Sequence, residues 1–352
     1  MVTMDNPQKI DIRKLSVDQL QEKLAENGHP KFRSKQIYEW LWKKGVSDFQ
    51  FMSNLSKDLR GALEADYIIN PIKIDKVQNS SDGTIKTRFV LHDGHMIESV
   101  LIPVPKTNRY TICVSTQVGC SLTCSFCATG KMKRIRNLDA AEIYDQYVQV
   151  NQQCLEKFDH PLTNIVYMGM GEPLLAYRTV LDSVDKFCSE TGLGMSPRRI
   201  TVSTAGIAKQ IKQLAHDKVK FNLAVSLHAA DDRKRNTIMP INESNNLSTL
   251  MEALKFFYLE TKNKISYEYI AFNEFNDTIE DAKKLIPLCK HFPVKVNIIE
   301  YNQIDGFDGR RSSGERLDKF AAFLTRNDVM VTVRKSRGKD IDAACGQLAN
   351  KN

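Results

Sequence analysis

The chain has 352 residues, 42% of them hydrophobic, with 50 basic and 42 acidic side chains and a formal charge of +8. This length suffices for one large domain with a small appendage. No apolar run approaches the ~18 residues that a membrane span needs, so we expect no membrane segment or membrane partner. The modest positive charge is compatible with a nucleic-acid partner but does not require one.

The N-terminus and the cysteines both indicate a cytoplasmic protein. Residues 1–7 have no basic segment followed by an apolar stretch, so we expect no secretory signal there. Eight cysteines in so long a chain do not make a small disulfide scaffold. Three of them, Cys154, Cys188 and Cys289, lie within or beside helical runs and are expected to fill the core. We expect a monomer.

Residues 1–70 predict a small helical module. Ser16, Ser34 and Ser56 each precede an apolar-periodic run and are predicted N-caps, and glycines follow the first two runs as stop signals. The module is rich in cations that either bind RNA phosphates or form solvated helix faces, and the sequence leaves both interpretations open. These cations are Lys31, Arg33, Lys35, Lys43, Lys44, Lys57 and Arg60.

Residues 71–107 predict a short antiparallel sheet extension. Apolar and polar residues alternate in three runs, which Ser-Asp-Gly and His-Asp-Gly turn signals separate. Glu98 lies in the last of these runs, where a charged residue by default occupies the exposed side of a strand.

Residues 108–335 alternate between short β-branched runs and longer helical runs, which is typical of parallel βα units. Six such units and a final strand predict an α/β fold, a partial (βα)6 barrel, whose functional groups collect at the carboxyl ends of the strands. The predicted strands are 110–115, 164–168, 199–203, 222–227, 265–272, 294–300 and 329–333. The predicted helices are 139–154, 177–191, 207–215, 247–258, 279–291 and 317–326.

Cys120, Cys124 and Cys127 follow the first of these strands with the spacing C-x3-C-x2-C. Thiolates suit iron–sulfur clusters or zinc, but structural zinc needs four ligands and no second Cys pair is present. A zinc site and three core cysteines remain the alternatives. The spacing resembles the signature of radical S-adenosylmethionine (radical SAM) enzymes. That resemblance implies a [4Fe-4S] cluster with one iron left open for SAM, which the cluster reduces to methionine and a 5′-deoxyadenosyl radical.

Polar residues also stand at the ends of later strands. Gly169-Met170-Gly171-Glu172 resembles the radical SAM "GGE" motif that holds the SAM amino group; alone, it reads equally as a turn with a carboxylate at a helix start. Hydroxyl, imidazole and amide groups at the next strand ends are each more often caps or satisfied polar groups, and only their shared position argues for a site. These are Ser203, Ser226, His228 and Asn302.

The C-terminal segment, 336–352, is a loop of small residues around Cys345, and four cations at 334, 335, 337 and 339 surround its start. Nearby cations favour a reactive thiolate, and the cations alone indicate a phosphate-binding patch. A poorly ordered terminus with an inert cysteine is the third interpretation. The residue pattern does not decide among the three.

The whole set resembles the RlmN family of adenine-C2 RNA methyltransferases, over nearly the full chain. The most specific segments are the cysteine triplet, Gly169 to Leu174, and Ile-Asp-Ala-Ala-Cys-Gly-Gln-Leu around Cys345. The resemblance implies that Gly171, Glu172, Ser203, Ser226, Leu227, His228 and Asn302 line the SAM site. It implies that Cys345 carries the methyl group, that Cys113 resolves the adduct, and that Glu98 accepts a proton.

The implied substrates are adenosine 2503 of 23S rRNA and adenosine 37 of tRNAs, with a flavodoxin or ferredoxin as reductant. Adenine C2 has no lone pair with which to attack a SAM methyl group. The implied route therefore uses two SAM molecules: one forms S-methylcysteine at Cys345, and the other yields the radical that activates this methyl group. The RNA is then linked covalently to the enzyme and released as a Cys113–Cys345 disulfide forms.

Three alternatives are kept open. A C8-methylating relative (Cfr-type) shares the two-cysteine apparatus, but its pattern has Ala where this chain has Pro173, which favours C2. Another radical SAM activity, such as a glycyl-radical activase, would not need Cys113 or Cys345. A metal-stapled RNA-binding protein without catalysis is the alternative from a different class.

Overall fold

The computed structural model describes residues 9–351, so residues 1–7, on which the expectation of no secretory signal rests, lie outside the described part. A ten-stranded sheet has the order β14-β13-β12-β11-β10-β9-β6-β5-β4-β3. Its strands are β3 (Lys73–Asn79), β4 (Ile85–Val90), β5 (Met96–Val104), β6 (Arg109–Cys113), β9 (Asn164–Tyr167), β10 (Ile200–Thr204), β11 (Asn222–Ser226), β12 (Ile265–Ala271), β13 (Val294–Glu300) and β14 (Met330–Arg334).

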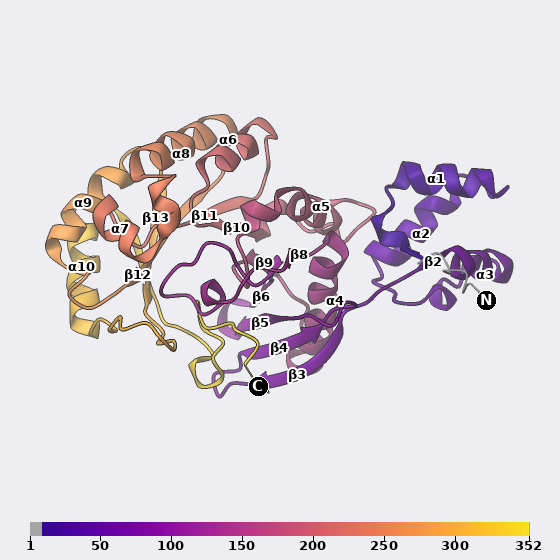
Figure 1. The fold of residues 1–352 in the computed structure, drawn as a ribbon, viewed down its shortest axis with the longest axis horizontal. Coiled ribbons are helices and arrows are strands. Elements are labelled where there is room, and N and C mark those ends of the chain that lie inside the picture. Colours follow the sequence, from indigo (N-terminus) through magenta and orange to yellow (C-terminus); the bar gives the residue numbers. More distant parts are fainter. Residues whose placement is uncertain (1–8, 352) are drawn as a thin grey trace, which may run out of the picture.

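Seven of these strands, from β6 to β14, run parallel, and each pairs with the next along the chain. Helices follow the strands in turn and lie in an arc around the outside of the sheet (Figure 1). They are α4 (Ala140–Phe158), α5 (Tyr177–Cys188), α6 (Ala208–His216), α7 (Asp232–Ile238), α8 (Leu247–Thr261), α9 (Ile279–Cys289) and α10 (Gly314–Arg326). Among the described strands β14 and β3 form the two edges and do not pair, so the barrel is open. The predicted partial (βα)6 barrel is confirmed.

The antiparallel extension belongs to this same sheet. Strand β6 pairs parallel with β9 on one side and antiparallel with β5 on the other, and β4 and β3 continue the antiparallel order. One face of the extension covers α4, where Thr87 and Ser99 donate hydrogen bonds to Gln153 and Gln146. Glu98 points to the opposite face because side chains alternate along a strand, and only 1% of it is exposed. The default expectation of an exposed Glu98 is therefore wrong.

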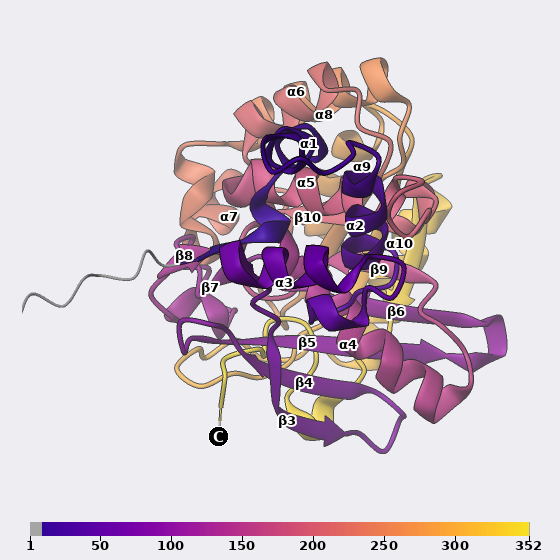
Figure 2. The same ribbon diagram turned by 90° about the vertical axis from the view of Figure 1, so that its right-hand side faces the viewer.

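Three helices, α1 (Val17–Glu26), α2 (Arg33–Trp42) and α3 (Lys57–Asp66), form the N-terminal part, and Figure 2 looks onto them. The predicted caps at Ser16 and Ser56 are confirmed, since each hydroxyl accepts from the amide three residues on. The predicted cap at Ser34 is wrong. Helix α2 begins at Arg33 with Phe32 as its N-cap, two residues before the predicted cap, and the buried Ser34 hydroxyl turns back to donate to the carbonyl of Lys31 at 2.8 Å. No helix among residues 9–351 is long and apolar enough to cross a membrane.

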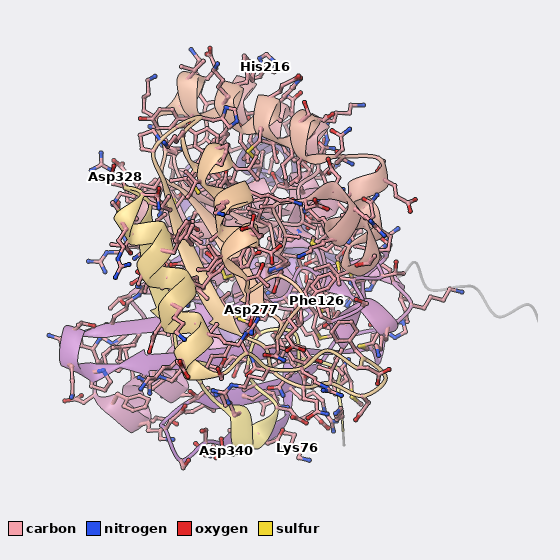
Figure 3. All side chains as sticks on the ribbon, turned by 90° about the vertical axis from the view of Figure 1, so that its left-hand side faces the viewer. Lys76, Phe126, His216, Asp277, Asp328 and Asp340 are labelled. Carbon is pink, nitrogen blue, oxygen red and sulfur yellow. The ribbon has the colours of Figure 1, made fainter. Side chains whose placement is uncertain are left out.

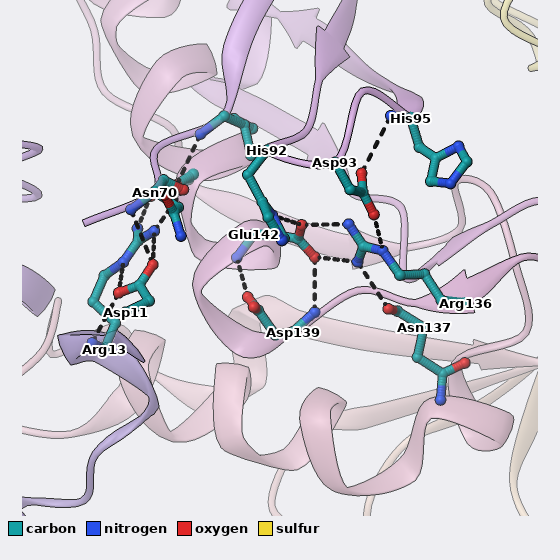
Figure 4. Close-up of polar contacts among 12 residues, drawn as sticks. Asp11, Arg13, Asn70, His92, Asp93, His95, Arg136, Asn137, Asp139 and Glu142 are labelled. Carbon is teal, nitrogen blue, oxygen red and sulfur yellow. Dashed lines mark hydrogen bonds and ion pairs between the residues drawn. The ribbon is translucent and has the colours of Figure 1, made fainter. Parts of the chain in front are cut away.

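Arg13 joins this N-terminal part to the barrel (Figure 4). Its guanidinium pairs with Asp11 at 2.9 Å and with Asp145 of α4 at 2.8 Å, and it donates to the carbonyl of Asn70. Asp145 also accepts from the amide of Ile72. Both partners of the Arg13–Asp11 pair have side chains only 4% exposed, so the ion pair is buried. The hydrogen bonds above pair its charged groups, which a buried ion pair requires.

Replacing Arg13 with Met should leave two buried carboxylates without their cation and lower the free energy of unfolding by about 3–5 kcal/mol. Urea denaturation measures this directly. The matched control is Lys14→Met, because the Lys14 ammonium is half-exposed and 3.9 Å from Asp139; we expect a change within about 0.5 kcal/mol there. Equal effects of the two substitutions would contradict the role of Arg13.

Candidate functional site

A cavity of about 880 Å³, open to solvent, lies where the loop after β6 meets the carboxyl ends of the parallel strands. All three cysteines of the C-x3-C-x2-C motif line it. Opposite them lie residues from the ends of four consecutive strands, which are Gly171, Glu172, Ser203, Ser226, His228, Glu268 and Ile270. The barrel topology thus brings together at one edge residues that are more than 100 positions apart in sequence.

The three cysteines are half-buried, and burial raises the pKa of each thiol, that of Cys120 to about 11. Gly130 closes the loop behind them, because a Cβ there would meet the Cys124 backbone at 2.8 Å. Among the described residues, no group of three His, Cys, Asp or Glu side chains converges on a single metal ion. A four-iron cluster does not need its cysteines to converge on one ion. Each cysteine ligates a separate iron, so the three thiols need only line one cavity. The three thiols on this wall fit that requirement.

The Gly169-Met170-Gly171-Glu172 turn brings backbone close to the cavity. Gly171 has φ +96°, and a Cβ there would clash with Gln117 at 2.5 Å. The Glu172 carboxylate accepts from the amide of Leu174 at 2.9 Å and from that of Ala205 at 2.7 Å. Burial raises the pKa of Glu172 to about 7, and these hydrogen bonds oppose the rise. A cationic ligand group in the cavity would favour the charged form.

His228 is held in one tautomer. Its Nδ1 accepts from the amide of Ile270 at 3.0 Å, so the proton sits on Nε2. Burial, assisted by the charge of Arg235, lowers the pKa of His228 to about 3. The residue has φ +54° and its ring meets Phe126 edge-on, with ring centroids 4.7 Å apart. His228 is therefore a neutral hydrogen-bond donor in the cavity wall.

Two of the residues predicted to line the SAM site do not line this cavity. The side chain of Leu227 is fully buried in the core, and only its backbone lies near the strand end. Asn302 lines a separate cavity together with Tyr301, Arg310 and Lys339.

Arg235 does not line the cavity but supports its wall, and sequence reasoning missed it. It lies on α7, a seven-residue helix that was not predicted because its sequence, Asp-Arg-Lys-Arg-Asn-Thr-Ile, has no apolar period. The fully buried guanidinium donates to the carbonyls of Ala205, Ser226 and Leu227 and to Asn242. It thereby ties together the ends of β10 and β11. Asp231, which caps the helix, was the only available signal.

Cys345 lies in the wall between the first cavity and a second one of about 780 Å³. Cys113 and Arg334 line the second cavity. The Cys345 thiol is exposed where it faces these spaces, although protein surrounds it closely enough for burial to raise its pKa, against the opposing effect of Arg334. Burial raises the pKa of Cys113 to about 12, and a charge on Cys345 adds to this rise. The interpretation of a poorly ordered terminus is wrong, because backbone groups of Gly346, Leu348 and Ala349 are hydrogen-bonded to the barrel and to β5.

Glu98 lies beneath the tail and is not among the residues that line either cavity. Its carboxylate accepts from the amides of Ala349 and Asn350 at 2.9 and 3.1 Å. The structure thus places the motif cysteines, Glu172, Ser203, Ser226, His228 and Cys345 around one space, with Cys113 in the adjoining one.

Three further cysteines were expected to fill the core. Cys154 is fully buried there, and Cys188 and Cys289 are half-buried and pack against the hydrophobic core.

Comparison with known proteins agrees with this geometry. A family model described as the radical SAM superfamily matches residues 114–286, and one described as the ribosomal RNA large subunit methyltransferase N-terminal domain matches residues 10–69. A crystal structure of a radical SAM methyltransferase from Sphaerobacter thermophilus is similar, with a TM-score of 0.91 and 38% identity over 97% of this chain and all of that one. The fold and site are therefore those of a radical SAM protein.

Curated relatives narrow the class further. A probable dual-specificity RNA methyltransferase RlmN from Cytophaga hutchinsonii is 54% identical over 97% of this chain and 93% of its own length. The dual-specificity RNA methyltransferase RlmN of Nautilia profundicola is 41% identical over 96% of this chain and 98% of its own. The chain belongs to the RlmN family of RNA methyltransferases.

The depressed pKa of His228 predicts a pH-dependent stability. The unfolded chain binds more protons than the folded one between pH 6.5 and about 3, so this stability is present above pH 6.5 and is lost as the pH falls through that window. At pH 5 the loss amounts to about 2 kcal/mol. Urea denaturation of the cofactor-free protein would give the free energy of unfolding at pH 7.5 and at pH 5. The difference between these two values should be smaller by about this amount in His228→Asn than in the wild type.

The control for this measurement is His216→Asn. His216 is exposed and is labelled at the top of Figure 3, and its replacement should leave the difference in unfolding free energy between pH 7.5 and pH 5 unchanged. The same pH difference in wild type and His228→Asn would contradict the assignment of His228 as a buried neutral residue.

Proposed function

We propose that the protein methylates C2 of adenosine 2503 in 23S rRNA and of adenosine 37 in tRNAs, with Cys345 as the methyl carrier. The observation that carries this proposal is the position of Cys345 in the wall shared by the two cavities. Cys345 faces the cluster motif on one side and Cys113 on the other. A carrier that must receive a methyl group and later release it to a resolving thiol needs access to both.

The cofactor sites follow from the first cavity. Cys120, Cys124 and Cys127 would hold a [4Fe-4S] cluster. The Glu172 carboxylate would bind the SAM ammonium, and a bound cation would offset the burial that raises the pKa of Glu172. Ser203, Ser226 and the Nε2–H of His228 are the donors for the remaining polar groups of SAM, with Gly171 and the backbone of Leu227 beside them. Asn302 is proposed on family resemblance alone.

The bound cluster and SAM supply a methyl group and a 5′-deoxyadenosyl radical. The Cys345 thiolate would take the methyl group by displacement, with S-adenosylhomocysteine as the leaving group. The methyl group on Cys345 would then lose one hydrogen to the 5′-deoxyadenosyl radical that a second SAM supplies. The resulting carbon-centred radical on Cys345 adds to adenine C2, which joins the RNA to the enzyme. The adduct would then give up one electron, for which the oxidised cluster is the available acceptor, and Glu98 would accept the C2 proton. The Cys113 thiolate would then attack the Cys345 sulfur and break its bond to the transferred carbon, which would keep the electron pair and take up a proton to become the methyl group. A disulfide that must be reduced would remain.

Specificity for C2 over C8 is proposed from Pro173, which follows Glu172 and starts a short 3-10 helix over Pro173–Ala176 at the cavity wall. The proposed electron donor is a flavodoxin or ferredoxin. The reducing cytoplasm suits both a cluster and a disulfide that is reopened in every cycle. We propose that the protein acts as a monomer.

Nucleoside mass spectrometry tests the function. Anaerobically reconstituted enzyme, a reductant and methyl-labelled SAM would be incubated with unmodified 23S rRNA and tRNA, beside the Cys345→Ala protein. We expect 2-methyladenosine from the wild type and none from the variant. A product of 8-methyladenosine would assign the chain to the C8 reaction instead, and 2-methyladenosine from Cys345→Ala would remove Cys345 as carrier.

Two cations beside the second cavity should bind RNA phosphates. Lys335 and Arg337 both line that cavity, whereas neighbouring Arg334 pairs with Glu268 at 3.3 Å. Replacing Lys335 and Arg337 together by Ala should weaken RNA binding about tenfold at low salt and reduce the slope of log affinity against log salt by about 1–2. An unchanged slope, measured by filter binding, would exclude these two side chains from the RNA contact.

A further inference from the structure

The tail that carries Cys345 crosses one face of the antiparallel strands β4 and β5, at the bottom of Figure 1. In the register of these strands Arg88 lies opposite Glu98, and Lys86 lies opposite Val100. Because side chains alternate along a strand, Lys86, Arg88 and Glu98 share the face that meets the tail. Arg88 donates to the carbonyls of Asn350 and Lys351.

Lys86 and Glu98 form an ion pair beneath the tail. The Lys86 Nζ lies 3.5 Å from Glu98 Oε1, and the side chains are 4% and 1% exposed. Lys86 also donates to the carbonyl of Asp342 at 3.3 Å, which is three residues before Cys345. Glu98 Oε2 accepts from the amides of Ala349 and Asn350, which are four and five residues after it. The pair therefore touches the loop that carries Cys345 at both ends.

Between these two ends, the loop rests on the segment that follows the cluster motif. The amide of Ala128 donates to the carbonyl of Gly346 at 2.7 Å, and the Thr129 hydroxyl donates to the carbonyl of Leu348 at 2.6 Å. Gly346 has φ +83°, so the chain turns sharply just after Cys345. With its ends fixed from below and its middle fixed from the side, the loop has little freedom to move the thiol.

We propose that Lys86 and Glu98 are positioning residues, a clamp that closes the neck of the Cys345 loop and sets where the Cys345 thiol stands between the two cavities. A buried ion pair persists only where its charges are well paired, and here each charge is matched by the other and by tail backbone groups. The inference rests on the proposed function only in taking Cys345 as the reacting residue.

The clamp separates two roles of Glu98 in time. While the tail is docked, the Glu98 carboxylate is engaged with the tail amides and lines neither cavity. Accepting a proton from RNA therefore requires the tail amides to release it. The clamp is closed while Cys345 receives its methyl group and open when the proton is removed.

Hydrogen exchange of the intact protein tests the clamp without turnover. In Glu98→Ala the amides of residues 345–351 should exchange at least about tenfold faster, because two charge-assisted hydrogen bonds are lost. In Glu98→Gln the amide oxygen still accepts, so exchange should stay within about threefold of wild type. Lys86→Met should speed exchange at 341–345. The matched control is Lys73→Met, an exposed lysine on β3 of the same sheet, which should change nothing. Unchanged exchange in Glu98→Ala, with α4 and β5 still protected, would overturn the clamp.

Peptide mass spectrometry of the loaded enzyme divides the two roles of Glu98. Glu98→Ala should slow S-methylation of Cys345 at least about tenfold. Glu98→Gln should restore the rate of S-methylation because its side chain still anchors the tail. The Glu98→Gln enzyme should nevertheless accumulate uncleaved RNA–protein adduct. Equal S-methylation rates in wild type and Glu98→Ala would overturn the positioning role. Failure of the wild type to methylate Cys345 would instead refute the proposed function, while the exchange measurement would still decide the clamp.

Discussion

The docking of the C-terminal tail across the strand ends is the constraint on which the site depends. The first cavity has the cysteines of the C-x3-C-x2-C motif on one side and strand ends on the other, but Cys345 and Gly346 complete its wall only because the tail is fixed there. The first contact that holds the tail is made by Asp340, which Figure 3 labels at the bottom of the molecule. Its carboxylate accepts from the Ser80 hydroxyl at 2.6 Å. The contacts continue through Lys86, Glu98 and the cluster loop. The antiparallel extension thus holds the loop that carries Cys345 in a fixed position against the barrel.

Buried polar groups give the opposite wall its rigidity. Arg235 holds three carbonyls at the ends of β10 and β11, and Glu172 and His228 each bind a backbone amide of a neighbouring strand or turn. Each of these groups would be costly to leave unpaired in the low dielectric of the interior, so the arrangement resists change. A ligand that meets preorganised donors and acceptors loses less free energy to ordering than one that must assemble them.

The barrel was predictable because strand and helix periods are local and the parallel order follows from their alternation. The cysteine triplet and Glu172 were predictable because each belongs to a motif that follows a predicted strand, β6 for the triplet and β9 for Glu172. Arg235 was not, since a short polar helix leaves no periodic trace, and Ser34 misled because a serine before an apolar run either caps or turns back. The burial of Glu98 and the placement of Cys113 and Cys345 around one cavity depend on where the tail docks, some 230–250 residues away in sequence, and no local pattern encodes that.

The most direct test of this account is whether turnover joins the two thiols that border the second cavity. Loaded enzyme would perform one turnover with RNA, anaerobically and without a thiol reductant, after which free cysteines are alkylated and the peptides mapped. If Cys113 resolves the adduct, a linked Cys113–Cys345 peptide should form in an amount equal to the methylated adenosine. Methylated adenosine formed in the same amount while Cys113 is recovered fully alkylated would contradict it.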